Sequence, residues 1–146
     1  MTIAFKNTAF SFAVIFCALP FAWAEECKIP DTLEGKTLLL RPSEAYSPNN
    51  PNAGQLMKLV FGQDRKYKNV YLTTDKSYQG TFEYKKDFEG VAHYIGEENF
   101  EGETTKYEIW FFCENNVSGR YVYRQQQGAT APDTRANNGL YSIDRH

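Results

Sequence analysis

The stretch 106–124 reads KYEIWFFCENNVSGRYVYR, and its pattern decides the fold class. Large apolar and polar residues alternate in its first half, which is the period of two of a β-strand. The face expected to point inward carries three large side chains: Tyr107, Ile109 and Phe111. Lys106 and Glu108 are expected to face solvent. Because Trp110 and Phe112 make the second face apolar too, we expect this strand to be central or covered.

The second half of the stretch predicts a tight turn and a returning strand. Residues 114–116 read Glu-Asn-Asn, and asparagine tolerates the positive φ angles of short hairpin turns. Tyr121 and Tyr123 then alternate with Arg120 and Arg124. The stretch therefore predicts an antiparallel hairpin of two long strands.

The same period of two recurs along the chain. Tyr78, Gly80, Phe82 and Tyr84 share one face of a predicted strand, and the segment 87–90 (DFEG) predicts another hairpin turn. Shorter apolar runs lie at 36–41, 56–61, 69–74, 91–95 and 139–143, which makes about eight strands. Helical periodicity is absent. The sequence predicts an all-β fold, a single antiparallel up-and-down β-barrel, because closure leaves no sheet edge free to recruit other chains.

The segment 1–24 has the pattern of an export signal. Lys6 lies in a short cationic head, 9–19 is an apolar run too short to span a bilayer, and Ala22 and Ala24 offer small residues before a cleavage site. We expect residues 25–146 to form one mature domain that is periplasmic or secreted. No stable membrane anchor is expected after cleavage.

Cysteine usage agrees with export. Cys17 lies within the predicted signal, so Cys27 and Cys113 remain and have one intramolecular pairing. A bridge between them would close a loop of about 87 residues and stabilise the fold by roughly 4 to 5 kcal/mol in chain-entropy terms. The alternative is two unpaired thiols that await a metal or a partner.

Charge and motifs exclude several function classes. The formal net charge is −2, which gives no electrostatic basis for binding nucleic acid. His93 and His146 are the two histidines, and we interpret His93 as a structural residue of a short strand rather than a catalytic base. Nucleophile elbows, phosphate loops and zinc-binding histidine pairs are absent from the sequence. We interpret the glutamates of 97–103 as a solvated loop rather than a calcium site. The sequence therefore predicts no enzyme, no metal and no cofactor.

Loop lengths indicate where binding occurs. In an up-and-down barrel the connections 42–55, 75–77, 96–103 and 125–138 meet at one end, and three of them are long. The connections 62–68, 87–90 and 114–116 at the other end are shorter. Because barrels place binding sites at loop-rich mouths, we expect ligand- or partner-binding residues there. The alternative is that the long loops are tolerated insertions.

Four residues are the sequence's candidates for that site. Tyr46 is the aromatic anchor expected on the first long loop, and Arg135 is the cation of the last, suited to a carboxylate or phosphate. Tyr84 and Tyr121 are inward-facing aromatics expected to contact a ligand. Substitutions at Glu89 or Asn115, at the short-turn end, are expected to leave binding unchanged.

The strand order also resembles a known family. The segment 35–40 (GKTLLL), an aromatic hairpin, 106–112 (KYEIWFF) and 117–123 (VSGRYVY) are together similar to a lipocalin-like calycin, nearest the small bacterial members of the MoaF-like group. The resemblance covers about 36–143. It implies a barrel whose interior holds a small apolar or amphipathic ligand, and it transfers no individual binding residue.

Three functions follow as hypotheses. The first is an exported carrier of a small hydrophobic or amphipathic ligand. The second is an exported protein-binding module, such as an enzyme inhibitor or a toxin-immunity protein. The third is a calycin-type enzyme, which would need a pocket that encloses His93 and a carboxylate. An interior cavity of about 300 Å³ or more would favour the carrier, and a filled core the protein binder.

Overall fold

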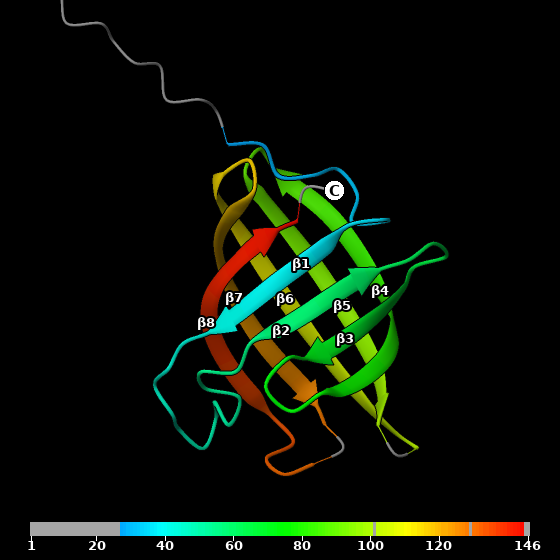
Figure 1. Cartoon of the computed structure of the whole chain (residues 1–146), viewed down its shortest axis with the longest axis vertical. Helices are drawn as coiled ribbons and strands as arrows, with labels where there is room; N and C mark the ends of the chain where they lie inside the picture. Colours follow the sequence, from blue (N-terminus) through cyan, green and yellow to red (C-terminus); the bar gives the residue numbers. More distant parts are fainter. Residues whose placement is uncertain (1–26, 101, 129, 145–146) are drawn as a thin grey trace, which may run out of the picture.

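The computed structural model describes residues 27–100, 102–128 and 130–144, and all regular structure within them is β-strand (Figure 1). The strands in chain order are β1 (Thr37–Pro42), β2 (Met57–Phe61), β3 (Lys66–Tyr71), β4 (Lys76–Phe88), β5 (Val91–Phe100), β6 (Glu103–Asn115), β7 (Ser118–Gln127) and β8 (Arg135–Ile143). Within these residues no helix is long and apolar enough to cross a membrane.

The eight strands form a closed antiparallel barrel. Each strand pairs with the next one along the chain, and β8 returns to pair with β1, with Leu40 opposite Tyr141. The predicted fold class and up-and-down topology are therefore confirmed. Closure satisfies the backbone hydrogen bonds of both terminal strands, which an open sheet would leave exposed.

The interior follows the predicted period of two. Tyr107, Ile109 and Phe111 are buried in the barrel, as expected, and Lys106 is exposed. Glu108 also lies on the outer face, but it is only partly exposed because it bonds to a neighbouring side chain. Burying one large aromatic or aliphatic side chain stabilises the fold by about 1.5 to 3 kcal/mol, so the interior rows dominate its stability.

Aromatic rings fill one half of the barrel. Phe82 stacks on Tyr94 with ring centroids 5.8 Å apart, Phe61 meets Phe82 edge-to-face at 4.9 Å, and Phe111 meets Tyr141 at 5.0 Å. Such pairs contribute roughly 0.5 to 1.5 kcal/mol beyond the area that they bury. This half, at the end where β6 turns into β7, is a packed core. We call it the closed end.

The segment that precedes β1 covers the closed end (blue in Figure 1). Ile29 and Leu33 are buried against the core, and Tyr84 Oη donates a 2.7 Å hydrogen bond to the carbonyl of Pro30. The disulfide between Cys27 and Cys113 joins this arm to β6, with Cα atoms 5.9 Å apart, which confirms the predicted pairing.

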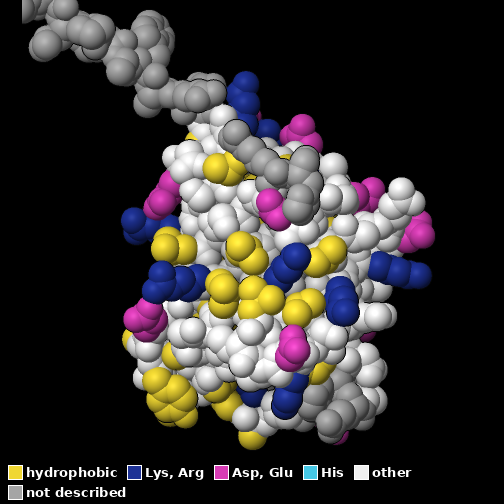
Figure 2. Space-filling model, in the orientation of Figure 1, with side chains coloured by type: hydrophobic (Ala, Val, Ile, Leu, Met, Phe, Trp, Pro, Cys, Tyr) yellow, Lys and Arg dark blue, Asp and Glu magenta, His cyan; other side chains and the backbone are white. Residues whose placement is uncertain are grey.

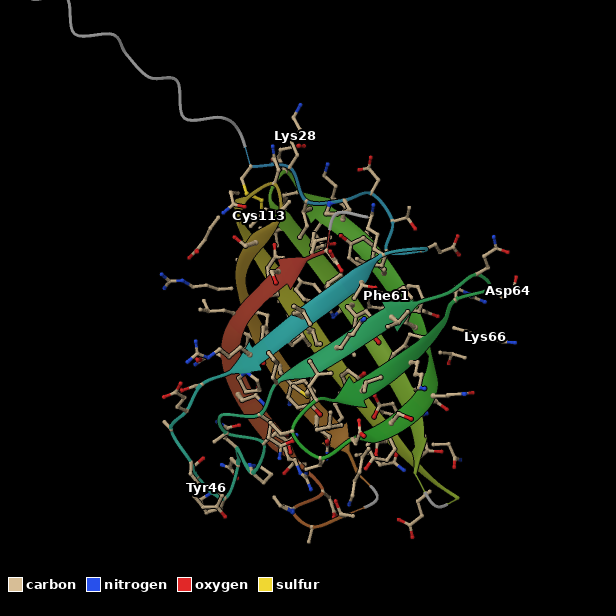
Figure 3. All side chains as sticks on the ribbon, in the orientation of Figure 1. Lys28, Tyr46, Phe61, Asp64, Lys66 and Cys113 are labelled. Atoms are coloured by element: carbon tan, nitrogen blue, oxygen red, sulfur yellow. A yellow bond between two sulfur atoms is a disulfide. The ribbon has the colours of Figure 1, made fainter. Side chains whose placement is uncertain are left out.

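The other end carries the long connections. The loops 43–56 and 128–134 both lie there, and Figure 3 shows Tyr46 at this end, opposite Cys113. The predicted gathering of these loops at one end is confirmed. We call it the loop end.

Several predicted boundaries were wrong. The run 69–74 was expected to be a strand, but β3 begins at Lys66 because Asp64 and Arg65, both with positive φ, complete the preceding turn earlier. The segment 96–103 was expected to be a long loop, but β5 continues to Phe100 and β6 begins at Glu103. The segment 125–138 was expected to be a loop throughout, but β7 continues to Gln127 and β8 begins at Arg135. The loop end is therefore built from two long connections rather than three.

The outer face of the barrel is mixed. Trp110 is covered by His93, whose ring stacks on it at 4.8 Å, but Phe112 is exposed, so the expected cover over this face of β6 is incomplete. Figure 2 shows hydrophobic side chains gathered between lysines and arginines on the face that β1, β2 and β8 form. Val60 and Leu140 are the exposed large aliphatic residues of β2 and β8.

Candidate functional site

A cavity of about 310 Å³ occupies the loop-end half of the barrel. It exists because the inward positions change character there. Where the closed end presents Phe61, Phe82 and Phe111, the loop end presents shorter polar side chains such as Asn69, Thr105 and Asn137. Inward rows of smaller side chains leave the barrel axis unfilled. The volume meets the threshold of about 300 Å³ that distinguishes a ligand pocket from a filled core.

The middle of the cavity is apolar and aromatic. Its aliphatic floor consists of Leu40, Met57, Leu59 and Ile109, all buried. Its aromatic wall consists of Tyr71, Tyr78, Tyr107, Tyr121 and Tyr123. Tyr71 packs edge-to-face on Tyr78 with ring centroids 5.6 Å apart, and the ring centroids of Tyr107 and Tyr123 are 5.2 Å apart. The rings of the wall therefore hold one another in place. The wall offers flat apolar faces together with hydroxyl groups.

Glu98 of β5 places a buried carboxyl group on the cavity wall, with 8% of the residue exposed. Its Oε1 accepts hydrogen bonds from Tyr67 Oη at 2.9 Å, Asn69 Nδ2 at 3.0 Å and Tyr107 Oη at 3.1 Å. Gly80 and Gly96 make this arrangement possible, because a Cβ on either would lie within 2.7 Å of the Tyr67 or Tyr107 ring. Each glycine gives a tyrosine ring room to lie flat over the sheet.

Burial raises the pKa of Glu98, and the hydrogen bonds from Asn69, Tyr67 and Tyr107 oppose that rise. Tyr67 Oη and Tyr107 Oη are also 2.7 Å apart, so they form a triangle with Glu98 Oε1. The two hydroxyls supply one proton each for three contacts, so the contact between the hydroxyls has no proton of its own when both donate to Glu98.

Several cavity-lining side chains hold an oxygen with no hydrogen-bond partner among the described residues. These oxygens are Gln55 Oε1, Asn69 Oδ1, Tyr121 Oη and Asn137 Oδ1. The orientation of the Asn69 amide is set by its Nδ2, which donates to Glu98, so its Oδ1 remains an acceptor. Unsatisfied buried acceptors are rare in folded proteins, and their concentration around one cavity indicates a place that receives hydrogen-bond donors.

Arg135 lies at the mouth of the cavity. Its guanidinium group donates to the carbonyl of Pro132 at 3.1 Å and to Thr130, both at the carbonyl, 3.2 Å, and at Oγ1, 2.8 Å. Gln125 Nε2 donates to the carbonyl of Asp133 at 2.8 Å. These bonds hold the loop 128–134 over the β7–β8 edge of the mouth, so Arg135 orders the rim.

The structure brings two of the four predicted site residues to this cavity, Tyr121 and Arg135. Tyr46 lies on the loop 43–56 at the same end and is 76% exposed, but its side chain does not line the cavity. Tyr84 lies toward the closed end, where it binds the N-terminal arm. The cavity and the candidate anchor Tyr46 are thus separate features of one end.

Sequence reasoning missed Glu98, the buried carboxyl group of the cavity wall. It was interpreted as part of a solvated acidic loop, but it continues the inward row of β5 that begins with Ala92, Tyr94 and Gly96. Extending that alternation by one step would have placed Glu98 inside. Asn69 was missed for a similar reason, because the predicted strand began at it rather than at Lys66.

His93 and its carboxylate partner, which the enzyme hypothesis requires in a pocket, lie outside the cavity. His93 is on the outer face, where Nε2 lies 3.1 Å from Glu108 Oε2, and this pair does not line the cavity. Among the described residues, no three His, Cys, Asp or Glu side chains are grouped to hold a metal ion. The arrangement of the cavity suits binding of an organic molecule by shape, aromatic contact and hydrogen bonds.

A second cavity, of about 280 Å³, lies at the closed end. Pro30, Asn116 and Ile143 are among its lining residues, and Asp144 borders it where the described chain ends. It contains neither an aromatic wall nor a buried carboxyl group among the described residues. We therefore place the candidate site in the first cavity.

Comparison with protein families, with curated proteins and with solved structures finds no match for this chain. The resemblance to calycins is thus supported at the level of the eight-stranded antiparallel barrel. Nothing in these comparisons supports a nearer relation to the MoaF-like group.

Proposed function

We propose that this chain is an exported binding protein whose barrel holds a small amphipathic ligand at the loop end. The observation that carries the proposal is the cavity of about 310 Å³, lined by an aliphatic floor, five tyrosines and a few convergent polar groups. Ligand sites in proteins have this composition, with apolar walls for affinity and a few polar groups for orientation.

The size and lining of the cavity narrow the ligand. A volume near the lower end of the range for small-molecule sites suits a compact molecule rather than a long-chain lipid. Polar groups occur on the wall as well as at the mouth, because Asn69 and Glu98 are buried beside the tyrosines. The ligand therefore has a polar group that enters the barrel together with an apolar body.

Export is part of the proposal and depends on the segment 1–24, which lies outside the described residues. The disulfide between Cys27 and Cys113 supports it, because such bonds persist in oxidising compartments outside the cytoplasm. Mass measurement of the protein from its native cells should show a mature chain that begins at Glu25. A chain that retains residues 1–24 and free thiols would contradict export.

Binding is tested with six small amphipaths that share two apolar bodies and three head groups. The aromatic series is tyramine, tyrosol and para-hydroxyphenylacetate, and the aliphatic series is hexylamine, hexanol and hexanoate. Ligand-observed NMR at millimolar concentration should detect binding of at least one probe to the mature protein. If none of the six binds, the small-ligand function is rejected.

A matched pair of variants assigns that binding to the cavity. Ile109→Trp adds bulk inside the cavity, where Ile109 is buried, and should abolish binding. Ile95→Trp adds the same bulk on the outer face, where Ile95 is 42% exposed, and should leave binding unchanged. Circular dichroism checks that both variants fold. Equal binding by the two would place the probe outside the barrel.

A protein-binding module is the second candidate, and the exposure of Tyr46 favours it. A tyrosine that is 76% exposed on a long loop is typical of interface anchors. Co-purification from the native envelope should then recover a protein that Tyr46→Ala loses. Phe88→Ala is the matched control, because Phe88 is 74% exposed and lies at the end of β4, at the closed end of the barrel. Loss with Phe88→Ala instead would place the interface at that end.

A further inference from the structure

We propose that the ligand of this cavity is a protonated primary or secondary amine with a compact apolar body, and that Glu98 is its anchor. The inference rests on the proposed function and names the class of ligand. It is carried by a buried carboxyl group on the cavity wall, by the rings around it and by the unpaired acceptors beside it.

The first step concerns the missing counter-charge of Glu98. None of the ion pairs among the described residues includes it, and its described hydrogen bonds come from neutral groups, Tyr67, Asn69 and Tyr107. A buried carboxylate without a cation is unfavourable, and burial raises the pKa of Glu98. An ammonium group that enters the cavity supplies the missing positive charge, and a proton that the carboxyl group holds leaves to solvent.

The second step concerns the aromatic wall. Tyr107 bonds directly to Glu98, and Tyr71 and Tyr123 line the same cavity, where burial first and the nearby Glu98 carboxyl group second raise the pKa of the Tyr71 hydroxyl. The faces of tyrosine rings attract cations, most strongly where water is excluded. A carboxyl group set among tyrosines is therefore complementary to a cationic head group and to the alkyl or aryl body attached to it.

The third step concerns hydrogen-bond donors. The buried oxygens Gln55 Oε1, Asn69 Oδ1 and Asn137 Oδ1 lack partners among the described residues, and the bond from Asn69 Nδ2 to Glu98 fixes Asn69 Oδ1 as an acceptor. An ammonium with N–H groups satisfies such acceptors, and a quaternary ammonium, a carboxylate or a phosphate does not. Among cations, these acceptors favour those with N–H groups, and primary and secondary amines carry two or more on a compact head group.

Two cations also face the cavity, and they do not reverse this preference. Lys76 is exposed, so solvent screens its charge. Arg135 donates to the carbonyls of Thr130, Ala131 and Pro132, whose partial negative charges offset it. Glu98 is the buried group, and electrostatic interactions are strongest where water is excluded. A ligand with an anionic group at its far end would meet Lys76 and Arg135 at the mouth.

The first test compares head groups on the unaltered mature protein. Isothermal titration at neutral pH should give tyramine at least about tenfold tighter binding than tyrosol, and hexylamine the same advantage over hexanol, because only the amines pair with Glu98. The carboxylate probes should bind weakest. Equal affinity of amine and alcohol, or preference for a carboxylate, would overturn the amine assignment and leave the binding function standing.

The second test removes the charge. Glu98→Gln keeps the acceptor oxygen for Tyr67 and Tyr107, and it should weaken tyramine binding by about tenfold while tyrosol changes by less than about twofold. Glu97→Gln is the matched control, since Glu97 is the adjacent residue and pairs with Lys106 on the outer face. It should leave both affinities unchanged. An equal effect of the two substitutions would mean that net charge, and not Glu98, selects the ligand.

Failure of this inference differs from failure of the proposed function. Absence of binding by all six probes rejects both. Binding that Ile109→Trp abolishes, but that ignores head-group charge and Glu98→Gln, keeps the carrier and rejects the amine. If Glu98→Gln does not fold, the comparison of amine with alcohol on the unaltered protein still decides between these outcomes.

Discussion

At the scale of single residues, Glu98 should make stability depend on pH. Burial raises its pKa above the ordinary glutamate value of about 4.3, so between that value and the raised one the folded protein holds a proton that the unfolded chain has lost. The contribution of Glu98 is therefore complete below about pH 4 and falls as pH rises through the raised pKa.

Glu98→Gln removes this dependence. Relative to the unaltered protein, the ligand-free variant should have a similar free energy of unfolding near pH 4 and a higher one near pH 8, by about 1 to 3 kcal/mol. Urea unfolding at a series of pH values measures the difference. Glu97→Gln, on the outer face, serves as the reference. A difference that stays constant with pH would show that Glu98 titrates normally in the folded protein.

At the scale of elements, the N-terminal arm should depend on its covalent anchor. Ile29 and Leu33 cover the closed end, and the Cys27–Cys113 bridge ties the start of the arm to β6. Replacing both cysteines with serine should lower the free energy of unfolding by up to about 4 to 5 kcal/mol. Amide exchange in 27–36 should speed up more than exchange in β5, because the arm loses its tether while the barrel stays closed.

Thiol labelling checks the premise of that prediction. The mature protein, unfolded without reductant, should expose no reactive thiol, and reduction should expose two. Reactive thiols before reduction would contradict the bridge. Unchanged exchange in the arm of the serine variant would show that apolar packing alone holds it in place.

At the scale of the whole molecule, ligand binding should slow amide exchange at the loop end only. A saturating amine probe at one hundred times its Kd should stabilise the protein by about 2.7 kcal/mol. It should slow amide exchange in the loops 43–56 and 128–134, which border the cavity, and leave the closed-end turns at 89–90 and 116–117 unchanged. Alanine at Glu89 or Asn115 should leave the Kd within about twofold. Protection confined to the closed-end turns would place the site there.

The sequence by itself determined the fold class and the barrel. Alternation such as that of Tyr107, Ile109 and Phe111 is read locally, because successive side chains of a strand point to opposite faces whatever the neighbours are. Two cysteines outside 1–24 left a single pairing, and the strand order placed the predicted loops 42–55 and 125–138 at one end, since alternate connections of an up-and-down barrel share an end.

Only the tertiary structure decided what the barrel encloses. Whether an inward position meets a ring, a void or a carboxyl group depends on the side chains across the barrel, which come from strands far apart in the sequence. Glu98 is buried because Tyr67 and Tyr107 reach it over Gly80 and Gly96, a contact among four strands. The cavity has the same origin, because its volume is the space that the inward side chains of the whole barrel leave unfilled. The pattern of a single strand does not determine that volume.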